Sequence, residues 1–143
     1  DKYEAGTPNI VGLAGLAAGV RFVLDRGVEQ IREQERCLTQ RLIDGLQNIP
    51  GVRIFGPRDA RRQTASVAFT IDGGSVSEVA QTLDEQFGVL CRPGLHCAPQ
   101  AHRTLGTFPQ GTLRFAPGPF STPAEMEQAL AAVARISGAA SRG

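Results

Sequence analysis

Both histidines and two of the three cysteines of this chain lie within residues 91–102. Cys97 directly follows His96 and stands five residues after Arg92. Cationic neighbours favour the thiolate form of a cysteine, and the thiolate is the nucleophile. Prolines stiffen the same stretch, and loops that are held by a rigid scaffold often carry functional residues. These residue types therefore indicate a reactive thiol at Cys97.

Two other interpretations of this stretch stay open. One is a surface loop that merely contains cysteine and histidine. The other is a metal site, since the side chains of Cys91, His96, Cys97 and His102 suit zinc. Their spacing does not match a zinc finger or ribbon, and two adjacent residues cannot easily both bind one ion, so we predict no metal. We interpret Cys91 as a small core hydrophobe and His102 as a surface histidine.

The composition narrows the classes of function. The 143 residues are the size of one domain, and 41% hydrophobic with 20% charged residues is ordinary for a globular protein. Fifteen basic residues against fourteen acidic ones give a formal net charge of +1, so we expect no nucleic-acid binding. The longest apolar stretch, residues 10–20, is too short and too rich in glycine to span a bilayer. An odd number of cysteines indicates reduced thiols and a cytoplasmic location.

The basic residues are almost all of one type. Fourteen of them are arginine, and the single lysine is Lys2. Chemistry that needs a buried lysine as a Schiff base therefore cannot be completed by this chain alone. Because the chain begins at Asp1 rather than at a methionine, we expect it to be a piece of a longer polypeptide.

The elements that must position Cys97 follow from local patterns. Residues 1–9 are irregular, and Thr7 is expected to cap a helix that has Pro8 in its first turn. A long two-part helical segment is predicted over residues 10–47, broken at Gly27. Its first part, residues 10–24, should expose an apolar face.

Strands are predicted over residues 52–55, 65–71, 89–91 and 112–115. Capping boxes at 75–78 and 122–125 should start helices that end at Gly88 and Gly138, and a short helix is expected over 98–105. The predicted fold is α+β: a small, mostly antiparallel sheet over residues 48–138 with helices packed on one side. The tail, residues 139–143, is expected to be disordered.

Three motifs in this sequence resemble those of one enzyme family. Residues 92–98, RPGLHCA, resemble the R-x-G-x-H-C-A motif of group II cysteine desulfurases and selenocysteine lyases. Those enzymes have the class V aminotransferase fold and use pyridoxal 5′-phosphate (PLP). Residues 4–9, EAGTPN, are similar to the segment that opens the last third of that family. Residues 113–115 and 120–122 resemble its later R-x-S-x-x-x-Y-N-T stretch.

The resemblance implies that residues 1–143 are the C-terminal small domain of a larger PLP enzyme, with 1–9 leading in from the missing large domain. The Schiff-base lysine would lie in that large domain. The intact enzyme would move sulfur from L-cysteine to an active-site cysteine as a persulfide and release alanine. The isolated piece would be inactive. A homodimer and a sulfur-acceptor protein are the partners that the resemblance implies.

Individual roles are carried over from the matching motif positions. Cys97 matches the cysteine that attacks the substrate's sulfur, and Arg114 matches the arginine that binds the substrate carboxylate. Arg92 matches the motif arginine, near both substrate and thiol. Thr7 matches the threonine that reaches the PLP phosphate of the neighbouring subunit. His96 would only support the loop.

The sequence also departs from the family pattern. Residues 98–100 read Ala-Pro-Gln where the family commonly has Ala-Gln-Pro, and residues 117–119, Pro-Gly-Pro, are stiffer than the usual spacer. The substrate therefore stays open between cysteine, selenocysteine and another amino acid. The chemistry of an epimerase or a transaminase on the same fold would leave Cys97 incidental. A stand-alone metal-binding module would use the Cys–His loop instead.

Overall fold

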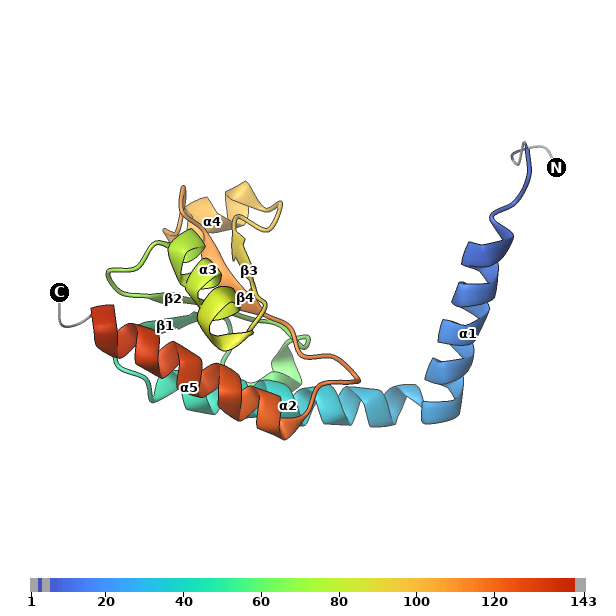
Figure 1. The fold of residues 1–143 in the computed structure, drawn as a ribbon, viewed down its shortest axis with the longest axis horizontal. Helices are drawn as coiled ribbons and strands as arrows, with labels where there is room; N and C mark the ends of the chain where they lie inside the picture. Colours follow the sequence, from blue (N-terminus) through green and yellow to red (C-terminus); the bar gives the residue numbers. More distant parts are fainter. Residues whose placement is uncertain (1–2, 4–5, 141–143) are drawn as a thin grey trace. The chain divides into compact units, whose positions relative to one another are not determined.

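The computed structural model describes residues 3 and 6–140 (Figure 1). Lys2, the first two residues of the 4–9 motif and residues 141–143 of the expected tail lie outside the described residues. The chain divides into two compact units, residues 1–33 and residues 34–143, and each is described by itself. No helix among the described residues is long and apolar enough to cross a membrane.

The first unit contains helix α1, Ile10–Arg26. Its cap is Asn9, whose Oδ1 accepts a hydrogen bond from the Gly12 amide at 2.9 Å. The prediction that Thr7 caps this helix is therefore wrong, because the capping side chain must come directly before the first helical residue. The predicted break is confirmed: Gly27 has a φ of 83° and separates α1 from the next helix.

The apolar residues of α1 face solvent, as the sequence predicted for residues 10–24. The exposed large side chains of this helix are those of Ile10, Val11, Leu13, Leu16, Val20, Val23 and Leu24. A helix of this length is marginal in water without a packing partner for its apolar residues. The unit therefore presents an apolar surface.

The second unit is built on a four-stranded sheet. Its strands are β1 (Val52–Phe55), β2 (Val67–Ile71), β3 (Arg92–Gly94) and β4 (Thr112–Phe115). Their order is β1-β2-β4-β3, and each neighbouring pair is antiparallel. A single turn of 3₁₀ helix, η1 (Ala60–Arg62), lies between β1 and β2. The predicted α+β class with a small antiparallel sheet is confirmed.

Helices cover one face of this sheet, as predicted (Figure 1). They are α2 (Val28–Gln47, from Gln34 onward), α3 (Val76–Phe87) and α5 (Pro123–Ala140). The alternating inward residues of β2 and β4 meet them in one core, where Phe69 is 0% exposed. The second half of α2 supplies Leu38, Leu42, Ile43 and Leu46 to that core. Burial of each such side chain contributes about 1.5–3 kcal/mol to folding.

Three local expectations differ from the structure. The strand predicted over 89–91 is wrong: β3 begins at Arg92 and contains Pro93. Proline is tolerated there because β3 is an edge strand with no neighbour on one side. Strand β2 begins at Val67 rather than at residue 65, and helix α5 continues past Gly138 to Ala140. The short helix expected over 98–105 is confirmed as α4, Pro99–Leu105.

Candidate active site

Strands β3 and β4 place Arg92 and Arg114 on the sheet face opposite α2, α3 and α5. Arg92 pairs with Arg114, and Gly94 pairs with Thr112. Leu113, between the two β4 residues, points into the core. Because successive side chains of a strand point to opposite faces, Arg114 and Thr112 lie on the face away from the helices.

The chain then turns tightly after β3. The Ala98 amide donates to the Leu95 carbonyl at 2.8 Å. The two residues between them have positive φ, 51° for His96 and 61° for Cys97. This is the pattern of a type I′ turn, which asparagine and glycine normally occupy. Each side-chain-bearing residue there costs about 1–2 kcal/mol, so the surroundings must hold the turn.

Cys97 stands at the exposed tip of this turn. Arg92 Nη2 donates a hydrogen bond to Cys97 Sγ, and these two atoms are 3.5 Å apart. The structure thus brings together the two motif residues that the sequence placed five positions apart, and it leaves the sulfur open to a reaction partner.

His96 is tied to the sheet rather than to the sulfur. Its Nε2 lies 3.1 Å from Thr112 Oγ1, while its buried Nδ1 has no hydrogen-bond partner among the described residues. Burial lowers the pKa of His96, and the positive charges of Arg114, His102 and Arg92 lower it further. The imidazole is therefore mainly neutral at neutral pH. The contact with Thr112 joins the loop to β4.

His102 is buried, with 5% of its surface exposed. The interpretation as a surface histidine was wrong. Its Nδ1 lies 2.7 Å from Thr107 Oγ1, and its ring centroid lies 5.7 Å from that of His96. Helix α4 is too short to show a clear apolar period, so only the tertiary packing reveals that this face of α4 is covered.

The other two cysteines differ from Cys97. Burial raises the pKa of Cys91 to about 11, and the Asp84 carboxylate acts in the same direction. Cys91 packs against the core, in keeping with its interpretation as a small hydrophobe. Cys37 is exposed on α2, and all three cysteines are free thiols. Cys97 differs from both in that its exposed sulfur accepts a hydrogen bond from an arginine side chain.

The metal interpretation finds no support in the geometry. Among the described residues, no group of three or more histidine, cysteine, aspartate or glutamate side chains could hold a metal ion. The ring nitrogens of His96 and His102 that have partners face threonine hydroxyls.

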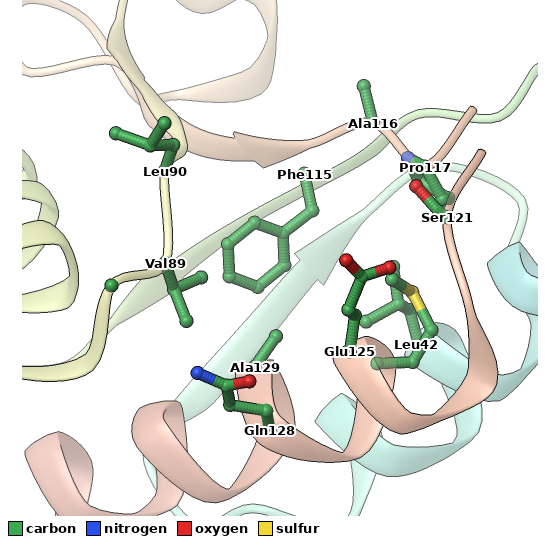
Figure 2. A pocket seen from close by; sticks show the side chains of 12 residues that line it. Leu42, Val89, Leu90, Phe115, Ala116, Pro117, Ser121, Glu125, Gln128 and Ala129 are labelled. Atoms are coloured by element: carbon green, nitrogen blue, oxygen red, sulfur yellow. The ribbon is translucent and has the colours of Figure 1, made fainter.

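A cleft of about 260 Å³ lies on the other side of β4. Figure 2 shows Phe115 at its centre, with Val89 to one side and Glu125 of α5 to the other. Glu125 accepts from the Thr122 amide at 2.7 Å, and Gln128 donates to the Phe87 carbonyl at 2.9 Å. The polar groups of this cleft are thus already engaged, and Cys97 does not line it.

Thr7 belongs to the first unit and is exposed two residues before the cap of α1. Its hydroxyl is therefore not used to start the helix. The role of Thr7 in binding the PLP phosphate stays a prediction.

The α+β fold is the one that the resemblance to class V aminotransferase-fold enzymes leads us to expect. Residues 1–129 match the model of the family described as aminotransferase class-V. The chain belongs to this family, whose members are in general PLP-dependent.

Relatives of this chain carry the name cysteine desulfurase. It is 38% identical over 135 residues to the probable cysteine desulfurase of Xylella fastidiosa strain 9a5c. It is 34% identical over 134 residues to probable cysteine desulfurase 2 of Mycobacterium leprae. Each match covers 94% of this chain and 31% of the relative. The chain therefore spans about a third of the length of these relatives.

Solved structures agree with this assignment. The apo cysteine desulfurase of Thermococcus onnurineus NA1 superposes with a TM-score of 0.88 at 34% identity, over 96% of this chain and 33% of that one. The S-sulfonic acid form of the Escherichia coli cysteine desulfurase CsdA gives 0.81 at 31% identity, over 94% and 32%. The predicted resemblance to cysteine desulfurases is confirmed.

Proposed function

We propose that this chain is the C-terminal small domain of a PLP-dependent cysteine desulfurase-like enzyme, which is cytoplasmic and homodimeric when intact. In that enzyme Cys97 accepts sulfur from L-cysteine or a selenium analogue, alanine is released, and a sulfur-acceptor protein takes the sulfur onward. The observation that carries the proposal is the exposed Cys97 Sγ, which lies 3.5 Å from Arg92 on the strand that pairs with Arg114. The names of the relatives support the same reaction.

The sulfur step can be written with this chain's own nucleophile. The Cys97 thiolate attacks the sulfur of the substrate, and a sulfur–sulfur bond forms as the substrate's carbon–sulfur bond breaks. The electron pair of the broken bond goes to the substrate's β-carbon, which takes up a proton and becomes the methyl group of alanine. Cys97 is left as a persulfide. PLP supplies the electron-withdrawing group that lets the substrate carbon accept this pair.

Arg114 and Arg92 give the site its positive charge. The planar guanidinium of Arg114 can bind a carboxylate through two parallel hydrogen bonds, a geometry that a lysine cannot offer. Arg114 is half-buried on β4, so its side chain is better fixed than one at the surface. We assign Arg114 to the substrate carboxylate and Arg92 to the Cys97 sulfur.

The residues present fit the substrate side of a PLP site only. The one lysine of the chain, Lys2, lies outside the described residues. On this proposal the lysine that binds PLP belongs to the large domain, which is not part of this chain. The exposed Thr7 would bind the PLP phosphate of the partner subunit. On this proposal the isolated chain is inactive.

The test uses the longer protein with its upstream residues, loaded with PLP and given L-cysteine without reductant. We expect one added sulfur on the peptide that contains Cys97, together with released alanine. Cys97→Ala should abolish multiple-turnover alanine production, whereas the matched change Cys37→Ala should leave it unchanged. Bound PLP with an unmodified Cys97, together with normal racemisation or transamination by Cys97→Ala, would assign the protein to epimerase or transaminase chemistry.

A further inference from the structure

The turn that carries Cys97 is held in a conformation that its residues disfavour. His96 and Cys97 both have positive φ, and neither is glycine or asparagine. Without external support such a turn would relax toward negative φ. Relaxation would move the Cys97 sulfur relative to Arg92, whose position is fixed by the pairing of β3 with β4. The 3.5 Å contact therefore depends on whatever anchors the turn.

The anchor runs from the first residue of the turn to β4. His96 Nε2 lies 3.1 Å from the hydroxyl of Thr112, which is 1% exposed. The backbone beneath this bond is closely packed: a Cβ on Gly111 would lie 2.1 Å from the Gly94 oxygen. Thr112 thus sits at a rigid point of the sheet, two residues before Arg114.

The charged and titratable groups that face the turn come from three elements. They are Arg92 on β3, Arg114 on β4 and His102 on α4, and all three lie close enough to influence His96. His102 also packs its ring against that of His96. Among these groups it is Arg92 that contacts the sulfur.

We propose that Thr112 and His96 are positioning residues, whose hydrogen bond fixes the turn so that the Cys97 sulfur is held against the Arg92 guanidinium. The inference rests on the proposed role of Cys97 as the sulfur acceptor. It concerns the reactivity of the thiol, however, and this can be measured without PLP or cysteine. A failure of the desulfurase assignment is therefore distinguishable from a failure of this inference.

The experiment measures alkylation by iodoacetamide, with each cysteine peptide read by mass spectrometry. The rate at Cys97 is divided by the rate at the exposed Cys37 in the same sample, which removes differences in reagent. Thr112→Val keeps the shape of the side chain but removes the hydroxyl. We expect the ratio at pH 7 to fall about fivefold, the effect of losing one unit charge near 4 Å in a solvated site.

Two matched variants serve as controls. Thr112→Ser keeps the hydroxyl, so its reactivity ratio should lie within twofold of the ratio of the unmodified chain. A twofold change corresponds to about 0.4 kcal/mol. Thr104→Val makes the same chemical change at an exposed threonine of α4 that bonds only within its own helix. It should leave the ratio unchanged.

The Arg92→Gln background separates charge positioning from a change of access. Without the guanidinium the turn holds the sulfur against no charge, so Thr112→Val should leave the ratio unchanged in that background. A fall of the same size with and without Arg92 would mean that access to the sulfur changed, and it would overturn the proposal. An unchanged ratio at pH 7 in folded Thr112→Val would overturn it as well.

Unfolding is reported within the same samples by Cys91, whose half-buried thiol reacts slowly while the fold is intact. If Thr112→Val unfolds, His96→Phe removes the same hydrogen bond from its other end and keeps a ring in place. We expect the same fall in the reactivity ratio for His96→Phe. An unchanged ratio in folded His96→Phe, or unfolding of both single variants, would contradict a positioning role.

Discussion

Arg92 and Arg114 lie directly opposite each other on neighbouring antiparallel strands. Like charges in this relationship destabilise a sheet, because their side chains share one face at close range. An anion bound between the two guanidinium groups would remove the penalty. The sheet edge is thus built less for its own stability than for holding negative charge, in this proposal the substrate carboxylate and the Cys97 thiolate.

The first prediction concerns Arg114 in the longer enzyme. Arg114→Lys keeps the charge but loses the planar fork, so KM for L-cysteine should rise about 10- to 100-fold, equivalent to the ~1.5–3 kcal/mol of a hydrogen bond to a charged group. Steady-state kinetics measure this. Arg53→Lys, an exposed arginine of β1 on the same sheet face, is the matched control and should change KM less than twofold. An equal change of KM in the two variants would contradict the assignment of Arg114 to the substrate carboxylate.

The second prediction concerns alkaline pH. Burial raises the pKa of Cys91 to about 11 from its ordinary value of 9.0. The stability that the protonated thiol contributes is therefore complete below pH 9 and is lost as the pH rises through about 11. Denaturant unfolding between pH 8 and 11 should show a steeper loss for the unmodified chain than for Cys91→Ala. Parallel pH profiles would show that Cys91 is not desolvated.

The third prediction concerns mildly acidic pH. Because the pKa of His96 is lowered in the fold, protonation favours the unfolded chain. The contribution of His96 is fully present above its ordinary pKa of 6.5 and is lost as the pH falls through the lower value in the fold. His96→Asn should therefore lose less stability than the unmodified chain between pH 7 and pH 5. An NMR titration of the His96 ring protons checks the direction of the shift independently.

The fourth prediction concerns the contact between Gly111 and Gly94. A side chain at Gly111 would meet the Gly94 backbone at 2.1 Å, and its φ of 81° disfavours any other residue. Gly111→Ala should destabilise the chain by about 2–4 kcal/mol, from overpacking together with the left-handed backbone. Gly118→Ala, where a Cβ would meet nothing within 4 Å, is the control and should change stability little. Thermal unfolding of the two variants gives the comparison.

Helix boundaries show how far local patterns reach. At the start of α5 the expected capping box forms: the Thr122 amide donates to Glu125 Oε2 and the Glu125 amide donates to Thr122 Oγ1. At the start of α3 the same pattern places the helix correctly, yet the Ser75 side chain makes no capping bond. Gly88 ends α3 in the left-handed conformation, as predicted. A helix cap is a local interaction, so the sequence can predict where it occurs. The neighbouring elements decide which capping hydrogen bonds form.

Motif spacing and apolar periodicity were sufficient to predict the family, the order of the elements and the thiol that we propose reacts, because both are local properties of the chain. The folded chain alone shows that β3 starts at Arg92, that His102 is buried and that Thr112 bonds His96. These features depend on strand pairing and on contacts between residues far apart in the chain. Hydrogen bonds of that kind leave no periodic pattern in the sequence.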